Sequence, residues 1–344
     1  MREVWNALVV AMLLGLGPGI PGRAGEPASG VTLVIVTGIA GAEEYESVFS
    51  DWSRHWRETG EQAGAQIFLI GENEAEEGEP SDRERLREVL AAESVSTEGE
   101  LWIILNGHGT FDGSIAKFNL RGRDVSASDL SEWLKACKRP MALVSGFSAS
   151  APFINALSGP NRVIVSATKS GHELNYSRFG GYVSEAITSL EADLDKDGQV
   201  SLLEAFLKGA RDTDEFYALE GRLASEHALI DDTGDRKGTG FDWFRGVRLI
   251  REAKGRIKPD GRRAHQFHLL RSEFEQLMPA ALREKRDALE MKILELRDQK
   301  KSFTDEDEYY AKLEGLFLQM GALYSEVEAR MEAVPGSGSE ASPE

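Results

Sequence analysis

Residues 101–109 (LWIILNGHG) and residues 141–150 (MALVSGFSAS) decide the fold of this chain, because each begins as an apolar strand and ends in small or polar residues. A third apolar run, Arg162–Thr168, follows them, and short helical patterns separate the three. Strands that alternate with helices favour a parallel sheet, and the carboxyl ends of its strands share one edge. The sequence therefore predicts that His108 and Ser148 reach the same edge of one sheet.

The same alternation extends towards the start of the chain. The run at 32–37 (TLVIVT) and the run at 66–70 (QIFLI) are continuous and apolar, as strands covered on both faces are. Segments 43–64, 83–92 and 129–137 carry apolar residues at helical spacing. We predict an α/β domain over residues 31–250, with a mainly parallel sheet covered by helices on both faces. The segment 241–250 is a candidate last strand.

From Ala264 to Arg330 the apolar residues recur about every 3.6 positions, and charged residues occupy the other positions. This pattern predicts a helical hairpin or coiled coil over 264–330, whose apolar stripe serves as core, as the seam of a homo-oligomer, or as the contact for a protein partner. Residues 335–344 are rich in Gly, Ser and Glu, and we expect them to be disordered.

Residues 1–24 resemble an export signal, with a basic start, an apolar run and small residues before Ala24. The run is shorter than the about 20 apolar residues that span a bilayer. We therefore expect an exported, periplasmic or extracellular protein with no membrane span after removal of the signal; a retained anchor is the alternative.

The formal charge of −18 argues against nucleic acid as a partner and favours a cation. With Cys137 as its only cysteine, the chain has no intramolecular disulfide, and the amphipathic pattern around Cys137 indicates a packing residue.

The segment Asp193–Glu204 fits the twelve-residue EF-hand loop at every position. Gly198 stands at position 6, where the backbone must reverse, and Val200 is the apolar residue at position 8. The predicted calcium ligands are Asp193, Asp195, Asp197, Gln199 through a carbonyl, Ser201 and Glu204. An acidic turn that only caps the next helix is the alternative. Because sensor EF-hands work in pairs, we expect a single loop to be a structural Ca²⁺ clamp, whereas the acidic turn 231–235 lacks this spacing.

His108 lies between Gly107 and Gly109 directly after a predicted strand. A histidine at this place can act as a general base, and the Gly109 N–H can stabilise an oxyanion. The motif is short, so it has little specificity by itself.

The order strand, His-Gly, strand, small-residue turn, strand resembles the caspase fold of caspases and legumains. Residues 31–245 are similar to bacterial legumain-like proteins in the segments 148–153 (SASAPF), 157–168, 169–175 (KSGHELN), 179–182 and 226–229. The resemblance implies that His108 is the base, that Gly109 belongs to the same motif, and that a peptide occupies the cleft at the sheet edge. In that family a cysteine attacks the peptide carbonyl, and Ser148 stands at the position of that cysteine, with Ala151 at the family's glycine.

The serine changes the expected chemistry, because a thiol ionises far more readily than a hydroxyl. A serine nucleophile needs a base that a third group, usually a carboxylate, orients. Three interpretations stay open: a catalytically degenerate scaffold, an endopeptidase or serine hydrolase that uses Ser148 and His108, and a different fold or unrelated chemistry. His172 and Glu173 either line the cleft or are solvated. The pair Glu226-His227 is interpreted as local structure, and His55, His265 and His268 as exposed residues of helices.

Overall fold

The computed structural model describes residues 30–73, 78–251 and 259–332 of the 344. The predicted export signal at 1–24 and the predicted disordered tail at 335–344 lie outside these residues. Within the described part of the chain, no helix is both long enough and apolar enough to cross a membrane.

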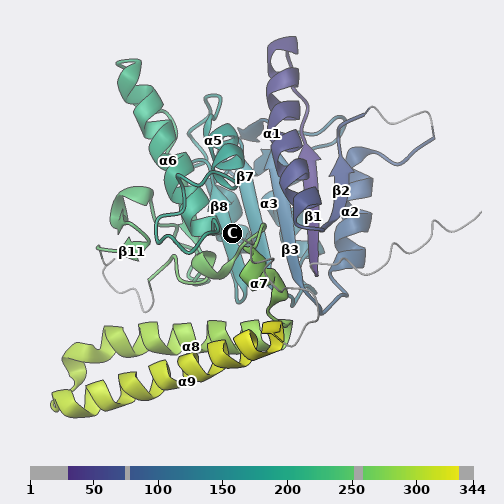
Figure 1. Ribbon diagram of the computed structural model, residues 1–344. Helices are drawn as coiled ribbons and strands as arrows, with labels where there is room; N and C mark the ends of the chain where they lie inside the picture. The colour runs from purple at the N-terminus through teal and green to yellow at the C-terminus, as the bar shows by residue number, and fades with distance from the viewer. Residues whose placement is uncertain (1–29, 74–77, 252–258, 333–344) are drawn as a thin grey trace, which may run out of the picture.

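The central sheet has six strands in the order β2-β1-β3-β7-β8-β9 (Figure 1). Its first five strands run parallel, and β9 at the edge runs antiparallel to β8. The strands are β1 (Val31–Thr37), β2 (Gln66–Ile70), β3 (Glu100–Asn106), β7 (Met141–Gly146), β8 (Arg162–Ser166) and β9 (Leu229–Asp231). The predicted mainly parallel α/β fold is thus confirmed.

The last strand of the sheet is not the one that the sequence suggested. Residues 241–250 contain the short helix η1 (Phe241–Trp243) and a two-stranded ribbon, β10 (Phe244–Arg245) with β11 (Arg248–Leu249). The edge position belongs to β9, whose Ile230 also exchanges backbone hydrogen bonds with Thr239. This second contact covers part of the outer edge of β9.

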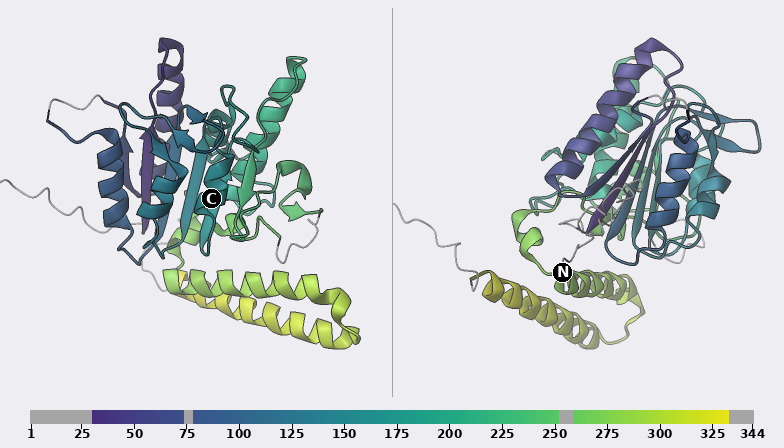
Figure 2. Two further views of the ribbon diagram at one scale, coloured as in Figure 1. Left: turned by 180° about the vertical axis from the view of Figure 1, so that it is seen from behind. Right: turned by 90° about the vertical axis from the view of Figure 1, so that its right-hand side faces the viewer.

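Helices cover both faces of the sheet, because alternate strand residues point to opposite sides (Figure 2). Leu33, Ile35 and Ile104 pack under α1, α5 and α6, whereas Val34 and Ile103 pack on α2, α3 and α4. The bounds are α1 (Glu43–Gln62), α2 (Asp82–Glu93), α3 (Ala127–Trp133), α4 (Ala151–Leu157), α5 (Phe179–Ala186) and α6 (Leu202–Leu219).

A small antiparallel sheet lies directly after His108. It consists of β4 (Gly109–Phe111), β5 (Ala116–Phe118) and β6 (Val125–Ser126). The Asn119 N–H donates to the His108 carbonyl at 3.0 Å, so this small sheet fixes the backbone on the outer side of the histidine.

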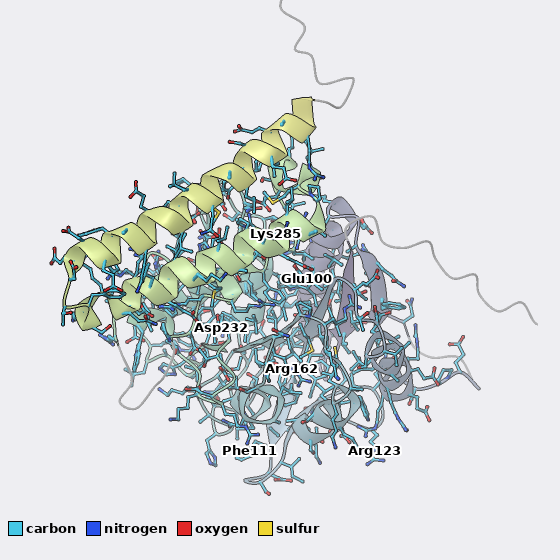
Figure 3. All side chains as sticks on the ribbon, turned by 90° about the horizontal axis from the view of Figure 1, so that it is seen from below. Glu100, Phe111, Arg123, Arg162, Asp232 and Lys285 are labelled. Atoms are coloured by element: carbon cyan, nitrogen blue, oxygen red, sulfur yellow. The ribbon has the colours of Figure 1, made fainter. Side chains whose placement is uncertain are left out.

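The C-terminal helical hairpin consists of α8 (Ala280–Asp298) and α9 (Glu306–Glu332), with the short helix η3 (Gln299–Ser302) between them. It lies across the end of the domain where the strands begin, and charged side chains cover its helices (Figures 1 and 3). Its own small core contains Met278, Leu282, Leu289, Leu323 and Val327.

The helical hairpin begins at Ala280 and not at Ala264. The preceding residues form two short helices, η2 (Ala264–Gln266) and α7 (Glu273–Leu277), because the Ser272 cap and Pro279 interrupt the pattern. Phe267 belongs to the main core, where its ring meets Trp102 at a centroid distance of 5.9 Å. The apparently continuous helical stripe of the sequence therefore contains residues that pack on two different cores.

Candidate active site at the carboxyl edge of the sheet

Strand register brings His108 and Ser148 to the same edge. Asn106, the last residue of β3, pairs with Gly146, the last residue of β7. His108 and Ser148 each follow two residues later, so both stand equally far beyond the sheet. The Gly109 N–H lies 3.4 Å from the Ser148 hydroxyl, which confirms that the two turns touch.

The Ser148 hydroxyl is buried and is held by backbone on both sides. Only 3% of Ser148 is exposed, and its Oγ donates to the Gly109 carbonyl at 3.1 Å while the Gly109 N–H points at the same Oγ. A hydroxyl has one proton, so this proton is engaged by a carbonyl and not by an imidazole. The Gly109 N–H, expected to face an oxyanion, faces Ser148 instead.

The turn after Ser148 is tight. Ala149 has φ of 58°, a left-handed conformation that is uncommon for alanine, and its N–H donates to the Glu173 carbonyl at 2.8 Å. A methyl group on Gly109 would lie 2.2 Å from the Ser148 carbonyl oxygen. Gly109 is therefore required by the packing of the two turns, whatever its catalytic role.

The His108 ring is held in one orientation. Its Nε2 lies 3.0 Å from the Ala40 carbonyl, which can only accept, so Nε2 carries the proton. The rings of Tyr45 and Phe49 from α1 meet the imidazole edge-on at centroid distances of 4.9 Å, and Tyr176 approaches at 6.3 Å. Burial lowers the pKa of His108, and the bond to Ala40 opposes this only in part.

No hydrogen bond joins the His108 ring to Ser148 among the described residues, and none joins it to a carboxylate there. Asp112, the acidic residue nearest in sequence, accepts from the Ser114 and Ile115 N–H groups of its own turn. The structure thus brings the two predicted residues to one edge without the contacts that would activate a serine.

Glu226 also contributes to the carboxyl edge of the sheet, and no sequence motif indicated this role. Its carboxylate is buried and accepts from the Ser177 hydroxyl (2.5 Å), the Arg178 N–H (2.9 Å), the Phe179 N–H (3.2 Å) and the Tyr217 hydroxyl (3.1 Å). The interpretation of Glu226 as local structure was wrong, since it reaches 49 residues back. It anchors the loop that carries Tyr176 to the His108 ring.

Glu173 belongs to the same loop. Its carboxylate accepts from the His227 ring nitrogen Nδ1 at 2.6 Å, and His172 meets Phe111 edge-on at a centroid distance of 5.1 Å.

Acidic side chains of the 193–204 loop converge as a cation site requires. Carboxylate oxygens of Asp193, Asp195 and Asp197 all lie within 4.8 Å of one another, and so do one ligand atom each of Asp195, Glu204 and His265. Gly198 has the left-handed φ of 86°. Oxygen ligands in this spacing fit a hard cation such as Ca²⁺. Glu204 also accepts from Ser201 and Leu194 N–H groups, so chelation through both of its oxygens needs a new rotamer.

His265 and His268 were expected to be exposed, and this expectation was wrong. His265 approaches the calcium-type loop, with its Nε2 3.2 Å from Asp195 Oδ2, and His268 is only 6% exposed. Burial lowers the pKa of His265, but the carboxylates of Asp195, Glu204 and Glu290 together more than offset this and leave the pKa raised. In the second acidic turn, 231–235, the Asp231 carboxylate accepts hydrogen bonds from backbone N–H groups, those of Gly234 and Arg236.

The chain was compared with known proteins. No family model matches the sequence, and no curated protein matches it. Two solved caspases are similar in fold. The Drosophila initiator caspase Dronc shows 14% identity and a TM-score of 0.40, covering 63% of this chain and 84% of its own. Caspase-1 from Spodoptera frugiperda shows 10% identity and a TM-score of 0.37, covering 62% of this chain and 92% of its own. Such similarity concerns the backbone only, so the chemistry of the site depends on this chain's own side chains.

Proposed function

We propose that this chain is an exported calcium-binding protein whose caspase-like or legumain-like domain is catalytically degenerate and holds a peptide or protein segment at the carboxyl edge of the sheet without cutting it. The observation that carries the proposal is the pairing of the Ser148 hydroxyl with the Gly109 carbonyl, together with the absence, among the described residues, of a hydrogen bond from the His108 ring to Ser148 or to a carboxylate. The proton that a serine nucleophile must lose is held by a backbone carbonyl, and the unprotonated Nδ1 of His108 makes no hydrogen bond to Ser148 among the described residues.

A serine nucleophile must lose its proton to a base as it attacks. In this chain the proton points at the Gly109 carbonyl, and the imidazole is enclosed by Tyr45, Phe49 and Tyr176. A productive contact requires the Ser148 hydroxyl to leave the Gly109 carbonyl and turn towards His108 Nδ1, whereas the bond from Nε2 to Ala40 can stay and orients the ring. The same burial and ring packing favour a rigid surface for recognition over a reactive centre.

The alternative is an active endopeptidase or serine hydrolase that uses Ser148 and His108. One observation favours it: Ala149, directly after Ser148, holds the left-handed φ of 58°, and strained turns of this kind occur beside nucleophiles. The positions of the two residues beyond neighbouring strands also suit this alternative.

A fluorophosphonate probe tests the choice directly. We expect no labelling of the unmutated protein, and Ser148→Ala serves as the control for reaction elsewhere. Ser148→Cys supplies a nucleophile that ionises near neutral pH, and a gain of peptidase activity in this variant is the expected sign of a degenerate site. Labelling that disappears in Ser148→Ala would establish the alternative and overturn the proposal.

Calcium binding is tested by thermal unfolding with calcium and with a chelator. A ligand that binds only the folded state raises Tm. We expect calcium to raise the Tm of the unmutated protein and of Glu220→Ala, an exposed change 16 residues beyond Glu204, but not that of Glu204→Ala. An unmutated protein that melts equally in both conditions would contradict a calcium site.

Export is proposed from residues 1–24 alone. When the full chain is expressed in bacteria, we expect the protein recovered from the periplasm or the medium to begin at Gly25 by N-terminal sequencing. Recovery of the intact chain from the cytoplasm alone would refute this part of the proposal.

A further inference from the structure

The segment 264–272, called here the bracing segment, runs beside the calcium-type loop and touches it at three points. His265 Nε2 lies 3.2 Å from Asp195 Oδ2. The Leu202 N–H donates to the Phe267 carbonyl at 2.8 Å, and the Ser272 N–H donates to the Gln199 side-chain oxygen at 3.2 Å. The contacts are distributed along both halves of the loop, at Asp195, Gln199 and Leu202, and along the whole bracing segment.

Apolar packing in the main core supports these contacts between the bracing segment and the loop. Ala264, Phe267 and Leu269 of the bracing segment are at most 2% exposed. They share the main core with Val200 and Leu202 from the end of the loop. EF-hand loops ordinarily pack against a second loop. Here the bracing segment packs against the single loop 193–204.

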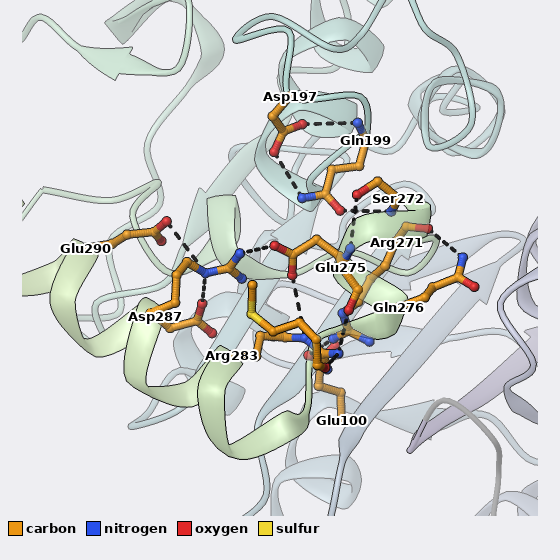
Figure 4. A network of polar contacts seen from close by, with 12 residues as sticks. Glu100, Asp197, Gln199, Arg271, Ser272, Glu275, Gln276, Arg283, Asp287 and Glu290 are labelled. Atoms are coloured by element: carbon orange, nitrogen blue, oxygen red, sulfur yellow. Dashed lines mark hydrogen bonds and ion pairs between the residues drawn. The ribbon is translucent and has the colours of Figure 1, made fainter. Parts of the chain in front are cut away.

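The bracing segment also contacts α8 of the C-terminal hairpin. Gln266, next to His265, donates through Nε2 to the Asp287 carbonyl at 3.0 Å and to Glu290 at 3.2 Å, both in α8. Ser272 caps α7 by accepting from the Glu275 N–H. The network from Asp197 and Gln199 through Ser272 to Glu275 and the arginines near it is drawn in Figure 4.

Glu275 completes the connection to α8. Its carboxylate pairs with Arg286, and both side chains are only 7% exposed. Buried charges that are paired lose much of their stabilisation when one partner moves away. The route from the loop to the hairpin therefore runs through two adjacent residues, His265 towards the loop and Gln266 towards α8, and through this buried ion pair.

We propose that calcium binding in the 193–204 loop and docking of the α8–α9 hairpin are coupled through the bracing segment, with His265 as a positioning residue that orients Asp195. This inference rests on the proposed calcium site. His265 Nε2 lies 3.2 Å from Asp195 Oδ2, close enough to orient that carboxylate towards an ion, as groups behind metal ligands do. A loop ordered by the ion offers fixed partners to residues 265, 267 and 272, so calcium stabilises the docked hairpin. By reciprocity the docked hairpin raises calcium affinity.

Isothermal titration of the full chain with calcium tests the role of His265. Removing a group that orients a metal ligand lowers affinity roughly 10- to 100-fold, so we expect His265→Ala to bind at least about 10-fold more weakly. His265→Gln keeps a side-chain donor and should recover most of the affinity. His172→Ala removes an exposed imidazole elsewhere and should bind as the unmutated protein does.

Hydrogen exchange of the α8 amides (280–298) tests the coupling. We expect calcium to slow this exchange about tenfold in the unmutated protein, within the usual range of coupling between sites. Gln266→Ala changes no contact with the loop, so it should still bind calcium, with an affinity lowered by the lost coupling, and it should lose this protection of α8. The unmutated protein provides the test even if a variant fails to fold.

The outcomes separate the two claims. Calcium binding with no change in α8 exchange, or an unchanged affinity in His265→Ala, would overturn the coupling and leave the calcium site in place. No binding of calcium by the unmutated protein would overturn both.

Discussion

Removing the Glu226 carboxylate should destabilise the loop that carries Tyr176, because the hydrogen bonds to residues 177–179 are lost. In Glu226→Ala four donors lose their acceptor, and among them the Tyr217 hydroxyl keeps a side-chain contact with the Ser225 hydroxyl at 2.9 Å. The Ser177 hydroxyl and the Phe179 N–H belong to residues that are at most 3% exposed. A buried donor left without an acceptor costs about 1–3 kcal/mol. Two such donors predict that the free energy of unfolding falls by about 2–6 kcal/mol.

Urea unfolding followed by tryptophan fluorescence measures this loss, and two further variants make the result specific. Glu226→Gln keeps one acceptor oxygen of the same shape, so it should lose only about 1–2 kcal/mol. Glu185→Ala removes an exposed carboxylate from neighbouring α5 and should change stability by less than about 0.5 kcal/mol.

Hydrogen exchange shows whether the loss is local. Residues 169–178 should exchange faster in Glu226→Ala, because Tyr176 then no longer has a fixed place against His108. If the free energy of unfolding of Glu226→Ala lies within about 0.5 kcal/mol of that of the unmutated protein, the reasoning is refuted, because the four hydrogen bonds then make no net contribution to stability.

Three further changes follow from the same structure. Gly109→Ala should lose at least about 2–3 kcal/mol in urea unfolding, because its methyl group would lie 2.2 Å from a backbone oxygen, whereas Gly315→Ala, with nothing within 4 Å, should gain stability. Ser148→Ala should lose about 1–2 kcal/mol because the Gly109 N–H then loses its acceptor; an unchanged stability would disagree with the observed pairing. Burial lowers the pKa of His268 to about 3, so below pH 6.5 the unfolded chain takes up a proton that the folded chain refuses, and stability present above pH 6.5 is lost as pH falls. Between pH 6.5 and 5 this loss is about 2 kcal/mol, and it should be absent from His268→Phe in unfolding curves at the two pH values.

Much of the fold could be predicted from alternating apolar runs, because β1, β3 and β7 are buried on both faces and leave a continuous signal. Strand β9 could not, since its three residues acquire their strand conformation from β8 and Thr239 rather than from their own pattern. The C-terminal boundary was misplaced for a related reason: residues 264–277 have the spacing of the hairpin, but Phe267 packs on Trp102, which lies 165 residues earlier.

The site was predictable in its position and not in its contacts. Strand order alone places His108 and Ser148 at one edge. The acceptors that engage them are backbone carbonyls of Ala40 and Gly109, and a sequence pattern carries no information about which carbonyl a side chain will meet. The approach of His265 to Asp195 joins residues 70 positions apart, so neither local spacing nor residue type pointed to it.

The hairpin crosses the end where the strands begin, whereas His108 and Ser148 stand at the end where they finish. An affinity handle attached after Glu332 would thus immobilise the protein on a sensor chip with the carboxyl edge facing the flowing solution. Peptide libraries could then be screened against that edge while calcium is varied in the running buffer.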